Sequence, residues 1–214
     1  PSGTWDGETS ASLCEDIASN WPESVLVLNE CEPRLRLDGT MFYETTEAGE
    51  KKEKLVPAVW HGIDEGSVDR VWMPSHHCCS GRMATEESEI VIDARVATGM
   101  EISLGDSVTI GAGNGRMNFT VVGIGLHSNH LYYAQDGDLF PAEPGTFATG
   151  YLSSEGLERL ANMSSGSSNL LLIDILGTPD YNLPSTDEDD GPELTLITQA
   201  MDEIISNSVD SPSL

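Results

Sequence analysis

One stretch, residues 89–127, constrains the fold more than any other part of the chain. It contains three β-type runs, at 90–93, 107–110 and 119–124, and the last two alternate between apolar and polar residues as half-buried strands do. Residues 111–115 between them carry three glycines and an asparagine, which tolerate positive φ and let the chain reverse. The stretch therefore predicts a short barrel or open sheet built around a hairpin.

The same glycines could instead form a phosphate-binding loop. Nucleotide-binding loops of the dinucleotide and P-loop kinds need a strand before the glycines and a helix after them, because the helix N-terminus supplies the amides that bind the anion. Here the loop leads into another strand, and no Lys-Ser or Lys-Thr pair follows it. The pattern favours a hairpin over a nucleotide site.

Three sequence phrases carry a resemblance to a known family. They are EIVIDARVATGMEISLGDSVTI at 89–110, FTVVGI at 119–124 and, upstream, ECEPRLRLDG at 30–39. The chain resembles the extracytoplasmic domain of ABC transporter permeases of the FtsX/MacB type, with a MacB-like periplasmic core. The resemblance extends over residues 10–206, and each phrase is a structural signature of strands and turns.

The resemblance implies an α+β fold with two lobes. Residues 1–75 and 146–214 would form an α/β, porter-like lobe, and residues 76–145 would form an inserted, mostly-β lobe. Such a domain is non-catalytic and couples the motion of a cytoplasmic ABC ATPase to an external substrate or partner protein. It stands on the extracytoplasmic face of the membrane, held by membrane helices that this chain lacks, and it could dimerise through the full-length permease. The chain is accordingly expected to be a fragment of a membrane protein.

Composition limits the other partners. The formal net charge is -26, from 36 acidic and 10 basic residues. Such a field repels phosphate backbones and anionic headgroups, so nucleic acid and direct membrane binding are disfavoured. High salt screens self-repulsion of this kind, which fits a saline or halophilic source; an acidic, very soluble ectodomain is the alternative.

The cysteines and histidines raise two further possibilities. Cys14 on a predicted helix and Cys31 at the end of the next strand could form a disulfide, although four cysteines allow three connectivities and two buried thiols are the alternative. Zinc or copper could bind His76, His77, Cys78 and Cys79, with His127 and His130 completing the site. Adjacent ligands on a strand point to opposite faces, so we expect no metal. A metal-dependent, secreted or cell-surface binding module is the alternative function.

Catalysis has little support in the sequence. Neither Gly-x-Ser-x-Gly nor His-Glu-x-x-His is present, and the acidic run at 187–190 lacks the glycine and glutamate spacing of a calcium-binding EF-hand. No catalytic residue or cofactor is therefore expected. A turn-rich loop at 136–145 is our candidate for a partner-facing surface.

Apolar patterning predicts the remaining elements. Helices are expected at 10–20, with Ser10 as N-cap, after Ser153 or Ser154 as N-cap with Leu157 and Leu160 inward, and at 192–206. Strands are expected at 25–28, covered on both faces, at 34–38, at 55–63, at 146–152 and, in a central position, at 169–176. Asp38-Gly39 predicts a turn, and residues 44–54 predict a solvated loop or hairpin tip.

Overall fold

The computed structural model describes residues 3–23, 26–47, 50–69, 71–73, 79–128, 142–143, 145–177 and 192–208. The fold is α+β, as predicted. The helices are α1 (Gly7–Asn20), α2 (Ala94–Gly99), α3 (Ser154–Ala161) and α4 (Pro192–Asn207). The strands are β1 (Leu28–Arg34), β2 (Arg36–Glu47), β3 (Glu50–Gly62), β4 (Val71–Trp72), β5 (Ser80–Gly81), β6 (Glu89–Asp93), β7 (Ser107–Ala112), β8 (Gly115–His127), β9 (Ala148–Leu152) and β10 (Leu170–Ile175).

The chain divides into two compact units. Unit 1 consists of residues 1–33 and 167–214, and unit 2 of residues 34–166. These boundaries differ from the expected ones near 75 and 146. The reason is strand pairing: β2 pairs with β7, and β9 pairs with β3 and β6, so the segments on either side of 76–145 belong to the same sheet as its strands.

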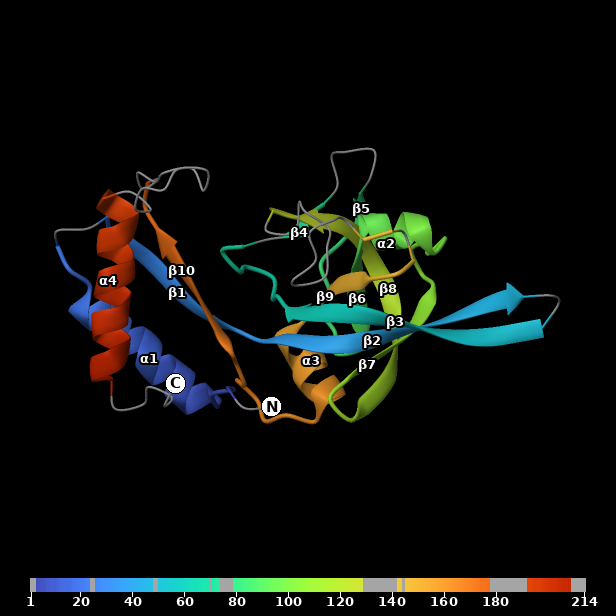
Figure 1. Ribbon diagram of the computed structural model, residues 1–214, viewed down its shortest axis with the longest axis horizontal. Coiled ribbons are helices and arrows are strands. Elements are labelled where there is room, and N and C mark those ends of the chain that lie inside the picture. Colours follow the sequence, from blue (N-terminus) through green and yellow to red (C-terminus); the bar gives the residue numbers. More distant parts are fainter. Residues whose placement is uncertain are drawn as a thin grey trace. The chain divides into compact units, whose positions relative to one another are not determined.

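Unit 2 is built on a closed circuit of strands. Following the pairings from β8 leads through β6, β9, β3, β2 and β7 and back to β8, which makes the sheet a barrel (Figure 1). The short strands β4 and β5 pair with the far end of β8. The β2–β3 hairpin continues beyond the circuit as a long arm, so the charged segment at 44–54 forms paired strands around a hairpin tip.

The predicted central hairpin is present as β7 and β8. Its strands run antiparallel with Ala112 opposite Gly115, and Gly113 in the turn has a φ of 55°. Val108, Ile110, Phe119 and Val121 all lie in the core, as the alternation predicts. Gly115 serves a different purpose from Gly113, because a Cβ there would overlap the backbone of α3.

The predicted turn at Asp38-Gly39 is wrong. Both residues lie inside β2, opposite Val59 and Ala58 of β3. A Cβ at Gly39 would overlap the Gly111 carbonyl oxygen and the indole of Trp60. The Trp60 Nε1 donates a hydrogen bond of 2.9 Å to that same carbonyl oxygen. Glycine is required here for close packing inside the barrel, and the chain does not reverse.

Unit 1 contains the first and last helices of the chain and a two-stranded sheet, β1–β10. Helices α1 and α4 contact each other, and Ser208 Oγ donates a hydrogen bond of 2.8 Å to Asp16 Oδ2. Five apolar residues of the two helices are buried: Leu13, Ile17, Ile197, Ala200 and Ile204. Trp5 and Ser168 form a backbone bridge between the two sequence segments of the unit.

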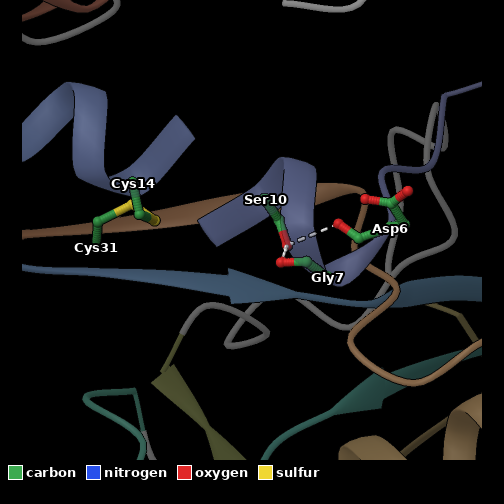
Figure 2. The surroundings of a disulfide bond; sticks show 5 residues. All are labelled: Asp6, Gly7, Ser10, Cys14 and Cys31. Carbon is green, nitrogen blue, oxygen red and sulfur yellow. Dashed lines mark hydrogen bonds between the residues drawn. A yellow bond between two sulfur atoms is a disulfide. The ribbon is translucent and has the colours of Figure 1, made fainter. Parts of the chain in front are cut away.

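The start of α1 differs from the expected one. The helix begins at Gly7, and its N-cap is Asp6, whose carboxylate accepts a hydrogen bond of 2.8 Å from Thr9 N. Ser10 lies inside the helix and donates to the carbonyl oxygens of Asp6 and Gly7 (Figure 2). An aspartate outcompetes the serine because its charged carboxylate also interacts favourably with the helix dipole.

Two strand predictions in unit 1 need correction. The apolar run at 25–28 is not a strand covered on both faces, because β1 begins at Leu28 and Val27 is 62% exposed. The run at 169–176 does form β10, but in a sheet of two strands and not in a central position. Its single acid, Asp174, accepts a hydrogen bond of 2.5 Å from Asn29 Nδ2. The helices after Ser153 and at 192–206 and the strands at 55–63 and 146–152 are confirmed.

Candidate functional site

The densest group of ionisable side chains in the described part of unit 2 lies between the loop at 64–69 and the end of β8. Arg34 is the central group: its Nη1 lies 3.0 Å from Asp69 Oδ2, and its Nη2 donates a hydrogen bond of 2.6 Å to Ser67 Oγ. The His127 Nε2 lies 2.9 Å from the same Asp69 oxygen. Arg34 and His127 are buried, and Asp69 is nearly so.

An aromatic stack adjoins this charged group. The Tyr151 ring lies between two imidazoles, with its centroid 5.4 Å from that of His127 and 5.7 Å from that of His61. Burial lowers the pKa of His127 below its ordinary value; the Asp69 carboxylate opposes the shift and Arg34 adds to it. Burial also raises the pKa of Tyr151 well above its ordinary value. The His127 imidazole and the Tyr151 phenol are therefore neutral near pH 7.

This arrangement fits a structural role better than a reaction centre. A general base must reach the proton of a substrate, yet His127 is 2% exposed and its Nε2 already faces Asp69. Ser67 accepts a hydrogen bond from the Arg34 guanidinium, which lowers the nucleophilicity of its hydroxyl oxygen. The cluster instead ties the 64–69 loop to the end of β8 and to Arg34, with each charge compensated by a neighbour.

Of the residues considered as metal ligands, the structure describes Cys79 and His127. His76, His77, Cys78 and His130 lie outside the described residues. Cys79 is disulfide-bonded, and a disulfide sulfur lacks the thiolate charge that binds zinc or copper. His127 is the buried partner of Asp69. In the described ranges, no three or more His, Cys, Asp or Glu side chains are grouped so that they could hold a metal ion.

Only the end of the predicted partner-facing loop at 136–145 can be described. Residues 136–141 and 144 lie outside the described residues. Glu143 is described, and its carbonyl oxygen accepts hydrogen bonds from Thr146 N at 3.1 Å and from Thr146 Oγ1 at 2.7 Å. The role of this loop as a contact surface therefore stays a prediction.

A groove in unit 1 is a second candidate site, and sequence reasoning missed it. It has a volume of about 660 Å³ and lies between α1 and the segment that leads into β1. Its apolar lining is Ala18, Trp21, Pro22, Val27 and Leu28, and its polar lining is Glu15, Glu23, Asn29 and Glu30. Three carboxylates thus line the groove together with apolar side chains, which include the exposed Val27.

Two contacts fix the walls of this groove. The disulfide between Cys14 and Cys31 links α1 to β1, with a Cα–Cα distance of 5.5 Å, and both cysteines line the groove (Figure 2). This pairing was among the connectivities that the sequence allowed, and it is confirmed. The Trp21 Nε1 donates a hydrogen bond of 2.7 Å to the Leu26 carbonyl oxygen, which holds the indole against the segment before β1.

One signal in the sequence could have pointed to unit 1. Of the 36 acidic residues, 17 lie in its two segments, 1–33 and 167–214, and these segments contain no Lys, Arg or His. All 10 basic residues belong to unit 2. Charge counted over the whole chain hides this asymmetry, because the two segments of unit 1 are far apart in the sequence.

Among the described residues, no helix combines the length and the apolar character that a membrane span requires. The sequence matches no protein-family model and no curated protein. Among solved structures, the chain is similar to the extracellular domain of a noncanonic ABC-type transporter, YknZ, from Gram-positive bacteria. The TM-score is 0.44 and the identity 12%, over 81% of this chain and 74% of that chain. A TM-score this low does not establish a common fold.

Proposed function

We propose that this chain is the non-catalytic, extracytoplasmic domain of an ABC transporter permease of the FtsX/MacB type. It would stand on membrane helices outside this sequence and would couple the motion of a cytoplasmic ABC ATPase to an external substrate or partner protein. The observation that carries the proposal is the topology. The first and last helices, α1 and α4, pack together in unit 1, and the whole of unit 2 is inserted between the two segments of that unit.

This topology suits a domain that is inserted between two membrane helices. Such a domain has to enter and leave through neighbouring segments, and a unit made from both segments meets that need. The sequence phrases behind the family resemblance also have structural counterparts. The phrases at 89–110 and 119–124 form β6, α2, most of β7 and the middle of β8, which are parts of the inserted barrel.

The disulfide between Cys14 and Cys31 supports an extracytoplasmic location. Disulfides persist in oxidising compartments and are rare in the cytosol, where thiols are kept reduced. The net charge of -26 supports a saline or halophilic setting, since high salt would screen the repulsion among the carboxylates.

A localisation experiment tests the proposal. Cells that express the complete natural gene are fractionated, and intact cells are treated with an external protease; an antibody against this chain detects the product. We expect the product in the membrane fraction, and we expect it to be digested in intact cells. A product that leaves the membranes on washing with salt, or that resists protease until the cells are lysed, would contradict the proposal.

A further inference from the structure

The groove in unit 1 follows the edge of a strand. Its lining includes five consecutive residues, from Val27 to Cys31, and the last four belong to β1. Successive side chains of a strand point to opposite faces, so consecutive lining residues place the groove along the edge of β1 and not over one face of the sheet. In the part of the chain that the structure describes, β1 pairs with β10 on one edge and with no strand on the other. An unpaired edge offers backbone N–H and C=O groups to another chain.

The charge around this edge has one sign. Glu15, Glu23 and Glu30 line the groove and are exposed. Unit 1 has no Lys, Arg or His that could neutralise them. The rest of the lining is mostly apolar, with Val27 62% exposed and Trp21 held in place by its hydrogen bond to Leu26. A ligand that complements this surface is cationic and carries an apolar group.

We propose that this groove binds an extended, basic peptide segment of a partner protein, which adds as a strand to the free edge of β1. The backbone of the segment would pair with β1, its Lys or Arg side chains would meet Glu15, Glu23 and Glu30, and one apolar side chain would cover Trp21 and Val27. The Cys14–Cys31 disulfide holds the strand and α1 together, so the groove is formed before the ligand arrives. This inference goes beyond the proposed function and does not depend on it.

The same features disfavour other ligands. Nucleic acid and anionic lipid would meet only carboxylates, because the cations of this chain all lie in unit 2. A small organic cation could pair with one glutamate, but it would leave the strand edge unused. A basic peptide with one apolar residue can pair with the strand edge, neutralise the glutamates and cover the apolar lining at the same time.

A peptide-binding titration of the 214-residue chain tests the inference. The probe is a labelled nine-residue peptide in which lysine alternates with valine around a central leucine, and binding is followed by fluorescence anisotropy. We expect saturable binding that weakens by about tenfold in the triple variant Glu15→Gln, Glu23→Gln and Glu30→Gln, because three exposed ion pairs with the peptide are lost. Neutral amides at exposed positions reduce repulsion, so the variant should fold; circular dichroism verifies this.

Two controls make the result specific. The variant Glu8→Gln, Glu65→Gln and Asp202→Asn removes the same charge from exposed positions outside the groove, and it should bind within about twofold of the original chain. A peptide N-methylated along one backbone edge, which cannot pair as a strand, should bind about tenfold more weakly. Equal weakening in both triple variants, unchanged binding of the N-methylated peptide, or no saturable binding of the lysine peptide would each overturn the proposal.

Discussion

At the scale of single residues, the buried guanidinium of Arg34 is central to unit 2. Arg34 compensates Asp69 and hydrogen-bonds Ser67, so it connects the first residue of the unit to the loop at 64–69. Removing one partner of a buried ion pair leaves the other charge buried and uncompensated. The resulting loss of stability is far larger than the net stability that the pair contributes.

Replacing Arg34 should therefore destabilise the barrel strongly. We expect Arg34→Ala to lower the free energy of unfolding of unit 2 by about 3–5 kcal/mol, and the double variant Arg34→Ala/Asp69→Ala to regain part of that loss. Urea unfolding followed by tryptophan fluorescence measures both. Arg159→Ala, which breaks an exposed ion pair with Glu87, is the matched control and should cost below about 1 kcal/mol. Equal losses in Arg34→Ala and Arg159→Ala would contradict the role of the buried pair.

Glu89 gives a second prediction, in the acid range. Its carboxylate accepts hydrogen bonds from Arg82 Nη1 at 2.7 Å, Thr85 N at 3.1 Å and Glu86 N at 3.2 Å. The Arg82 hydrogen bonds are the largest cause that lowers the pKa of Glu89 from 4.5 to about 2. A carboxylate with a lowered pKa stabilises the fold above its unfolded pKa, and this stability is lost as the pH falls from about 4.5 to about 2.

The variant Glu89→Gln should remove that dependence. We expect a loss of about 1–3 kcal/mol at pH 7 and a difference from the original chain that shrinks toward zero near pH 2. Unfolding curves at several pH values measure this. Glu50→Gln, at the start of β3, is the control and should change the free energy of unfolding at pH 7 by less than about 0.5 kcal/mol. A loss of the same size at pH 7 and pH 2 would show that Glu89 acts without its charge.

The structural role of a residue could be predicted from the sequence only where its near neighbours in the chain decide that role. The pairing of Cys14 with Cys31 was within reach, because neighbouring elements carry the two thiols. The role of Gly39 could not be predicted, because glycine is needed there to avoid overlap with Trp60 and Gly111, which are distant in sequence. The groove was missed because Glu15, Glu23 and Glu30 appear as ordinary solvated charges until α1 and β1 are brought together.

At the scale of elements, the disulfide holds α1 to β1. A crosslink over this sequence separation of 17 stabilises by about 3 kcal/mol, chiefly by restricting the unfolded chain. Unit 1 has a small sheet and few fully buried apolar side chains, so it depends on this crosslink more than the barrel does.

Removing the crosslink should loosen unit 1 alone. We expect Cys14→Ser/Cys31→Ser to speed amide hydrogen exchange in α1 and β1 by about a hundredfold, the equivalent of the lost 3 kcal/mol, and to leave β6, β7 and β8 protected. Hydrogen exchange with mass spectrometry measures each segment, and the barrel strands serve as the internal control. Exchange that accelerates equally in both units, or in neither, would contradict the account.

Element predictions succeeded where periodicity is unambiguous. The alternation in β7 and β8 predicted both the hairpin and its buried face. The continuous apolar run of β10 predicted a strand but not its place, because apolar residues on both faces fit a central strand and a partly exposed strand of a small sheet equally well. Pairing of distant segments, such as β3 with β9, has no local signal and sets the boundaries of the units.

At the scale of the whole molecule, charge is distributed unevenly. Unit 1 carries 17 of the 36 acidic residues and none of the 10 basic ones. Unit 2 pairs several of its acids, as in Arg82–Glu89 and Arg159–Glu87. Unit 1 has no basic side chain of its own to relieve this repulsion, so ions from solution should screen it.

Salt should therefore stabilise unit 1 more than unit 2. Raising sodium chloride from about 0.15 M to 1 M shortens the Debye length from about 8 Å to about 3 Å. We expect a clear rise in the melting temperature of unit 1, and a smaller rise in the variant Glu15→Gln, Glu23→Gln and Glu30→Gln, which has less repulsion to screen. Differential scanning calorimetry measures both. A melting temperature that falls or stays constant with salt would show that the carboxylates do not limit stability.

The central claim, that this chain is a permease domain working with a cytoplasmic ABC ATPase, is tested most directly by purification of the complete natural gene product from its own membranes. The product is extracted in mild detergent, captured with an antibody against this chain, and its companions are identified and quantified by mass spectrometry. The account predicts an ABC ATPase in stoichiometric amount. A product that purifies without any ATPase would contradict it.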